Sequence, residues 1–121
     1  MKHFRLLFSL ILLLLCFPAL VYALSVNLAW DYTQGSTAAT NFVMERCVGS
    51  GCTGYSTLST TIPVATLAYS DTAVTYNTWY SYRVRAKDAQ GGLSAPSNVV
   101  SFQTPAATVD APVNLRGTVT P

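Results

Sequence analysis

The sequence predicts an all-β protein with the architecture of an antiparallel β-sandwich. Short segments with alternating apolar and polar residues recur about every ten residues, with turn-forming residues between them. No segment after residue 23 shows the helical period of about 3.6 residues. An apolar stretch at the N-terminus has the composition of an export signal, which directs the rest of the chain out of the cytoplasm.

Residues 1–23 have the three parts of a secretory signal peptide. A basic start with Lys2 and Arg5 precedes an apolar run over residues 6–17, which Pro18 ends. The run is shorter than the ~20 residues that a membrane-spanning helix needs, and the small residues before residue 24 resemble a signal peptidase site. We therefore expect a cleaved signal in preference to a membrane anchor. The product is expected to be secreted or at the cell surface, or periplasmic if the source is bacterial, with no membrane attachment after cleavage.

The expected mature chain carries almost no net charge. Loss of Lys2 and Arg5 leaves five basic side chains against five acidic ones. A neutral protein has no field that attracts nucleic acid. His3, the single histidine, is removed with the signal, which excludes histidine-activated nucleophiles and histidine-ligated metals. We therefore expect no cofactor, no metal and no nucleic-acid partner.

The carboxylates do not form a recognisable catalytic arrangement. Asp31, Asp71 and Asp88 fall beside predicted turns, where aspartates usually accept hydrogen bonds from their own backbone. A glycosidase needs two carboxylates that face each other across a cleft, which a small closed sandwich does not provide. The sequence therefore predicts that the protein is not an enzyme.

Cys47 and Cys52 enclose four residues, two of them glycines. In an oxidising compartment, two cysteines this close in a turn favour a disulfide. A redox pair usually has two intervening residues, and zinc would need two further ligands. We expect a disulfide that fixes a hairpin tip and contributes no more than the low end of about 2–4 kcal/mol, because the ring is small. Cys16 lies in the expected signal, and Leu15 before it is too large for a lipoprotein site.

The stretch WYSYRVRAKD over residues 79–88 contains most of the basic side chains, on alternate positions. Adjacent side chains of a strand point to opposite faces, so the aromatic and basic residues cannot interleave on one nucleic-acid-binding surface. The basic set is expected to be exposed beside Glu45 of a neighbouring strand: Arg83, Arg85 and Lys87. The aromatic set joins inward residues of two earlier strands in the predicted core: Trp30, Phe42, Tyr80, Tyr82 and Val84.

Three segments, NLAWDY, NFVMERC and the run from Tyr69 to Pro105, resemble a fibronectin type III module. The resemblance covers residues 24–105 and is most specific in the last run. It implies an immunoglobulin-like sandwich in which Trp30 is the core tryptophan. It also implies that Tyr80 is the corner tyrosine, whose hydroxyl bonds back to the preceding loop. The Arg-Gly-Asp tripeptide of some members is absent.

The resemblance implies three parts: the signal peptide over 1–23, a fibronectin type III-like domain over 24–104, and a linker with a further strand over 105–121. The first strand of such a module is missing before Val26, whereas residues 111–121 have the pattern of one. We interpret these residues as the start of a truncated second module. In the alternative, they complete the first module. Because the missing strand leaves an edge unpaired, we expect the chain to associate with itself.

Modules of this family supply spacing and contact surfaces, so the sequence predicts a secreted, non-catalytic domain that acts as a spacer or protein-interaction module. The alternative is a carbohydrate-contacting accessory module of a polysaccharide-degrading or cell-surface protein. Three aromatic residues are candidate stacking platforms for such a contact surface: Trp79, Tyr55 and Tyr32. The expected partner is accordingly an extracellular protein or polysaccharide.

Overall fold

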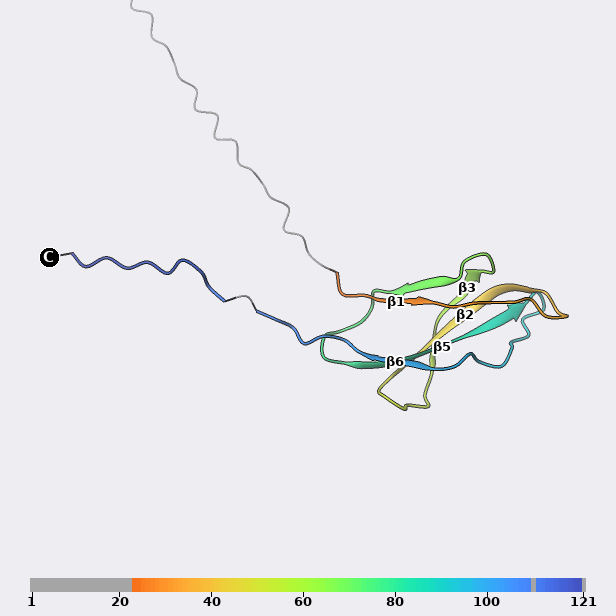
Figure 1. The fold of residues 1–121 in the computed structure, drawn as a ribbon. Helices are drawn as coiled ribbons and strands as arrows, with labels where there is room; N and C mark the ends of the chain where they lie inside the picture. Colours follow the sequence, from red (N-terminus) through yellow and green to blue (C-terminus); the bar gives the residue numbers. More distant parts are fainter. Residues whose placement is uncertain (1–22, 110, 121) are drawn as a thin grey trace, which may run out of the picture.

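The computed structural model describes residues 23–109 and 111–120, and the predicted signal peptide lies outside this part apart from its last residue. The described residues form strands and no helix (Figure 1). None of them forms a helix long and apolar enough to cross a membrane. The strands are β1 (Val26–Ala29), β2 (Ala39–Val48), β3 (Ser56–Pro63), β4 (Ala68–Asp71), β5 (Trp79–Asp88) and β6 (Val100–Gln103).

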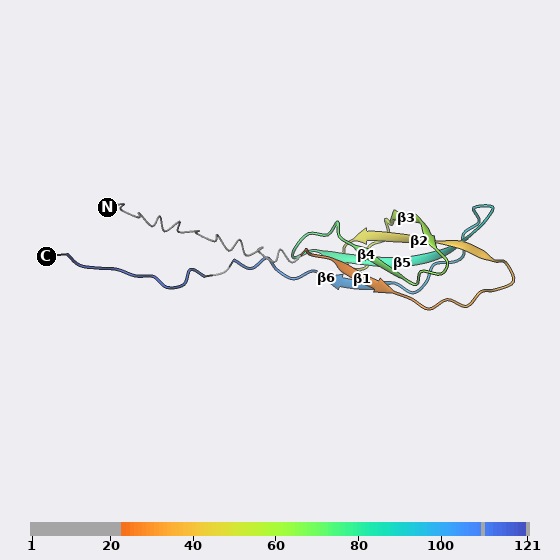
Figure 2. The ribbon, with the colours of Figure 1, turned by 90° about the horizontal axis from the view of Figure 1, so that it is seen from above.

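The strands form two antiparallel sheets, which confirms the predicted sandwich (Figure 2). One sheet has two strands in the order β1-β4, and the other has four in the order β3-β2-β5-β6. The long strands β2 and β5 pair along almost their whole length, from Ala39 opposite Asp88 to Val48 opposite Tyr80. They form the centre of the larger sheet, and the smaller sheet covers one of its faces.

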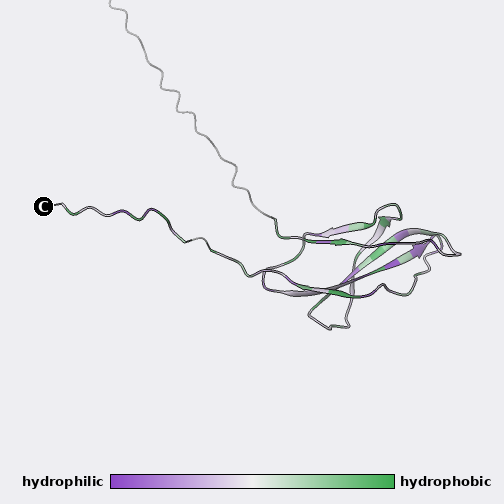
Figure 3. Ribbon diagram, in the orientation of Figure 1, coloured by the Kyte–Doolittle hydropathy of each residue, from purple (hydrophilic) through white to green (hydrophobic). Residues whose placement is uncertain are grey.

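The core lies between the two sheets. Its buried members are Leu28, Phe42, Met44, Ile62, Tyr80 and Tyr82. Apolar (green) segments occur along the strands that supply these side chains, and others occur in the C-terminal tail outside the domain (Figure 3). Trp30 and Val84, which were expected in the core, are only partly buried, because both line an open side of the sandwich.

The basic side chains of β5 are not exposed as predicted. Arg83 and Arg85 expose only 22% and 23% of their side chains, and Lys87 is also partly buried. The reason is Glu45, which lies opposite Arg83 on β2 and forms ion pairs with both arginines. Charge pairing across the strands therefore holds the long side chains against the sheet.

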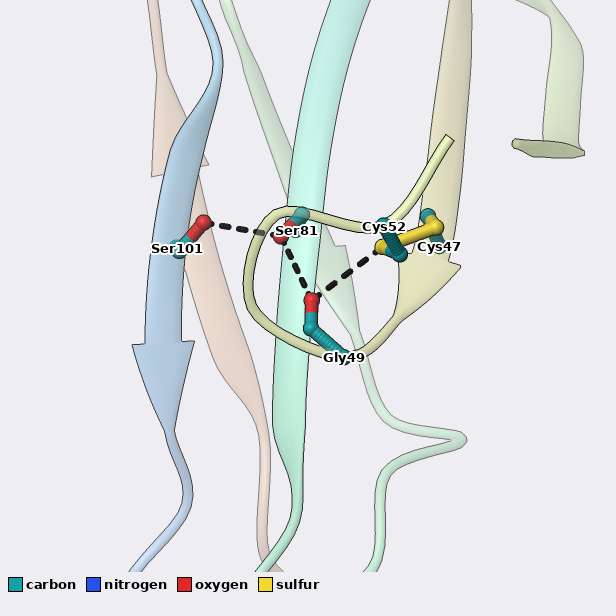
Figure 4. The surroundings of a disulfide bond; sticks show 5 residues. All are labelled: Cys47, Gly49, Cys52, Ser81 and Ser101. Atoms are coloured by element: carbon teal, nitrogen blue, oxygen red, sulfur yellow. Dashed lines mark hydrogen bonds between the residues drawn. A yellow bond between two sulfur atoms is a disulfide. The ribbon is translucent and has the colours of Figure 1, made fainter. Parts of the chain in front are cut away.

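Ser81 lies on the same face of β5 as these basic side chains, the outer face of the larger sheet. It is nevertheless completely buried, because the loop after β2 curves over it (Figure 4). Its hydroxyl donates to the carbonyl oxygen of Gly49 at 2.7 Å and lies 2.7 Å from the hydroxyl of Ser101 on β6. The loop that shields the Ser81 hydroxyl from water thus also supplies the acceptor for its hydrogen bond.

The C-terminal tail, over residues 111–120, forms no strand and extends away from the domain (Figure 1). Its apolar side chains are open to solvent: Val113 is 80% exposed, and Leu115 and Val119 are each 98% exposed. In this structure the tail therefore does not complete the sheet that β1 begins.

Candidate contact surfaces

A disulfide joins Cys47 at the end of β2 to Cys52 in the following loop (Figure 4). The turn between them uses Gly49, whose φ of 121° favours glycine. The amide of Gly49 donates to the carbonyl oxygen of Trp79 at 2.8 Å, which ties the loop to the start of β5. The disulfide loop thus shapes one end of the larger sheet, beside Trp79.

The three candidate aromatic residues do not form one surface. Trp79 is 42% exposed at the start of β5, where it lies opposite Gln103 of β6. The ring of Tyr55 is covered by the guanidinium of Arg83, at 4.0 Å from the ring centre. Tyr32 packs edge-to-face against Phe42 of the core, with 5.0 Å between the ring centres. Only Trp79 remains available as an exposed platform among the three.

The hydroxyl of Tyr80 bonds to the loop that precedes β5, as the resemblance implied. The backbone amide of Thr75 donates to it at 3.0 Å, and the Thr75 hydroxyl lies 3.1 Å away. This contact fixes the crossing from β4 to β5. The hydrogen bond to the Thr75 hydroxyl lowers the pKa of Tyr80.

Asp71 is the centre of a buried polar network that the sequence interpretation missed. Its carboxylate accepts hydrogen bonds from Arg46 Nη1 at 2.7 Å, from the hydroxyl of Tyr82 at 2.9 Å and from the amide of Ala73 at 3.0 Å. The guanidinium of Arg46 also lies over the ring of Tyr80, at 5.1 Å from its centre. The network links β2, β4 and β5, and therefore joins the two sheets. Only the bond to Ala73 is the local turn contact that the sequence predicted.

Because of this network, the free energy of unfolding of the domain depends on pH in the alkaline range. Burial, followed by the hydrogen bond to Asp71, raises the pKa of Tyr82 above its usual value. Above about pH 10, a tyrosine in the unfolded chain loses its proton while folded Tyr82 keeps it, so the free energy of unfolding falls as pH rises. We expect Tyr82→Phe to remove this component, so that its urea midpoint falls less steeply than that of the unsubstituted chain between about pH 9.5 and 11.

The lowered pKa of Tyr80 has the opposite effect on the free energy of unfolding, and this effect is present in both proteins. The difference between their two slopes of urea midpoint against pH therefore reports on Tyr82 alone. Equal slopes for the unsubstituted chain and Tyr82→Phe would contradict the assignment of the raised pKa to this side chain.

One side of the sandwich is open between the edge of β1 and β6. A hollow of about 380 Å³ there is lined in part by core side chains, among them Leu28, Met44, Tyr82, Val84 and Val100. A second hollow, of about 550 Å³, adjoins it toward Tyr32 and the Gly92–Ser97 segment, and Trp30 lines both. Within the described residues, the indole nitrogen of Trp30 is buried without a hydrogen-bond partner.

Two carboxylates line the hollows: Asp31 lines both, and Asp88 lines the larger one. Asp88 accepts from the amides of Gln90 and Gly92 at 2.9 and 2.7 Å, so its carboxylate orders its own turn. Among the described residues, no three His, Cys, Asp or Glu side chains are grouped so that they could hold a metal ion.

Solved structures with the same fold include an Fn3-like protein from Clostridium thermocellum. It superposes with a TM-score of 0.55 at 29% identity, over 70% of this chain and 81% of that one. The twitchin kinase region from C. elegans matches with a TM-score of 0.55 at 19% identity, over 67% of this chain and 14% of that one, which shows the fold alone. The described domain therefore has a fibronectin type III-like fold.

The sequence is similar to segments of several carbohydrate-active enzymes. Exoglucanase B of Cellulomonas fimi is 39% identical over 83 residues, which are 66% of this chain and 7% of that protein. Exoglucanase A of the same organism is 44% identical over 63 residues, 50% of this chain and 7% of the enzyme. Chitinase A1 of Niallia circulans is 37% identical over 95 residues, 74% of this chain and 11% of the chitinase. The chain thus spans only 7% to 11% of these relatives, and no protein-family model matches it.

Proposed function

We propose that the chain is a secreted, non-catalytic fibronectin type III-like module that acts as an extracellular spacer or protein-interaction domain in a polysaccharide-degrading system. The observation that carries this proposal is the kind of relative that the chain matches. The same small segment is similar to parts of exoglucanases and of a chitinase. The part that selects or cleaves a polymer should differ between enzymes named for different polymers, whereas a spacer is compatible with any of them.

The bonding of the carboxylates supports a role without catalysis. Glu45 is paired with two arginines, Asp71 is held in the buried network, and Asp88 orders its turn. A glycosidase needs one carboxyl group available as an acid and a second as a base or nucleophile, both facing a bound sugar. The three carboxylates have structural roles instead.

The second candidate is contact with a polysaccharide, and Trp79 is the observation that favours it. An exposed indole can stack on a sugar ring, and polar groups nearby can orient the sugar hydroxyls. Trp79 lies opposite Gln103, whose side-chain amide donates to Asn77 Oδ1 at 3.1 Å. In this function Trp79 supplies the stacking surface, while Tyr55 and Tyr32 are occupied within the domain.

A binding experiment separates the two candidates. The chain from residue 24 to 121 is mixed with microcrystalline cellulose and with chitin, and the protein left in solution and the reducing sugar released are measured. For a spacer we expect no depletion and no sugar release. Depletion that Trp79→Ala abolishes and Tyr55→Ala preserves would replace the spacer by a carbohydrate-contacting module. Sugar release above that of a heat-denatured control would overturn both.

A further inference from the structure

The open side of the sandwich combines an unpaired backbone edge with a hollow that reaches the core. Within the described residues, β1 pairs only with β4. The amide of Trp30 donates to the carbonyl oxygen of Leu67 at 3.1 Å, toward β4. Because backbone groups alternate along an antiparallel strand, those of Leu28 also face β4, and those of Asn27 and Ala29 face the open edge. This edge is ready to accept a further strand.

The hollow beside this edge has room for aliphatic side chains, and its lining combines apolar residues with Asp31, Arg83, Ser97 and Asn98. Its volume is about 380 Å³, and its lining includes Leu28, Met44 and Val100. An apolar cavity of roughly 150 Å³ already holds a benzene-sized group, so this hollow has room for two aliphatic side chains. A two-stranded sheet is also only marginally stable by itself, which favours its extension at β1.

The C-terminal tail has the pattern that the edge and the hollow require. Val113, Leu115 and Val119 alternate with polar residues, so an extended tail presents them on one face. They are also among the most exposed apolar side chains of the described chain, at 80% to 98%. Asn114 has a φ of 60° and must become extended for a strand to run through it, a change that asparagine accommodates more readily than most residues.

The direction of the chain decides which copy the tail can join. The start of β1 and the tail lie at the same end of the domain (Figures 1 and 2). A strand that pairs antiparallel with β1 must enter from the opposite end, beside Trp30. Reaching that end of its own domain would require the tail to run back along the sandwich and then reverse. The tail of a second copy, approaching from beyond Trp30, reaches it without any reversal.

We propose that the tail of one copy, over Val113–Val119, adds as an antiparallel strand to β1 of the next copy. Val113 and Leu115 fill the hollow beside Leu28, and backbone bonds form to Asn27 and Ala29. Each copy provides one tail and one acceptor edge, and the tail of a partner enters from the end opposite to the copy's own tail, so the contact is heterologous and the association propagates head to tail.

Sedimentation velocity over a range of concentrations tests the proposal on the chain from residue 24 to 121. We expect a concentration-dependent series of species beyond the dimer, and only monomer for a chain that ends at residue 109. Leu115→Asp should abolish the series because it places a charge in the hollow. Thr118→Asp is the matched control: it adds the same charge on the opposite face of the same tail and should preserve the series.

Amide hydrogen exchange identifies the acceptor edge directly. In the associated chain, the amide hydrogens of Asn27 and Ala29 should exchange at least about tenfold more slowly than in the chain that ends at residue 109. A synthetic peptide of residues 111–121 should restore this protection to the shortened chain, and the same peptide with Leu115→Asp should not. An unchanged series after removal of the tail, a closed dimer, or protected edge amides in a tail-containing monomer would each overturn head-to-tail strand addition.

Discussion

Asp71→Ala is expected to lower the free energy of unfolding by about 3–5 kcal/mol, because it leaves a partly buried arginine and a buried phenol without their common partner. The carboxylate is 3% exposed and accepts hydrogen bonds from Arg46, Tyr82 and Ala73. Urea denaturation followed by circular dichroism measures the change. The loss is a large part of the roughly 5–15 kcal/mol that stabilises a typical domain.

Asp31→Ala is the control for this substitution, since Asp31 is exposed and removal of its carboxylate should alter stability by no more than about 0.5 kcal/mol. If Asp71→Ala costs as little as Asp31→Ala, the network does not hold the two sheets together.

Phe42→Ala is expected to cost about 3–5 kcal/mol for a different reason, the cavity that it leaves in the core. Phe42 is 2% exposed on β2, and the rings of Trp30 and Tyr32 pack edge-on against it at 5.3 and 5.0 Å between centres. Loss of the ring removes the support of both aromatics together. We expect the substituted chain to be partly unfolded at 37 °C, seen as a broadened thermal transition.

Val48→Ala is the matched substitution on the same strand, because Val48 is 65% exposed and its truncation leaves no cavity. A thermal midpoint for Phe42→Ala close to that of Val48→Ala would show that the aromatic cluster does not contribute to the stability of the core.

Sequence patterns predicted correctly those strands in which the alternation of apolar and polar residues matches the burial of the side chains in the structure. The stretch over residues 79–88 forms β5 with the same bounds, because its aromatic face is needed in the core. The bond of Tyr80 to the preceding loop followed from the family resemblance. Alternation does not reveal which distant strand will lie opposite, so the pairing of Arg46 with Asp71 was not predicted. Local patterns also do not show that a loop from much earlier in the chain will cover Ser81.

The candidate surface was less predictable than the fold, because a pattern of aromatic residues does not distinguish exposed rings from rings used in packing. Tyr55 looked available, but Arg83 stacks on it. Trp30 looked like a fully buried residue, but it borders the open side, since the strand that would cover it is absent from the described part of the chain. In both cases the deciding contact comes from residues far away in the sequence.

The position of the two chain ends has a mechanical consequence when the domain is pulled through its first residues and its tail. The backbone reaches β1 and leaves β6 at the same end of the domain (Figure 1). Tension applied through these two points separates β1 and β6 from their neighbouring strands one hydrogen bond at a time. This mode of unfolding needs far less force than shearing, in which all the hydrogen bonds between two strands must break together. A folded copy also adds little to the distance between its anchors, whereas its unfolding would release the whole contour length. The domain would then serve better as an extensible tether than as a rigid rod.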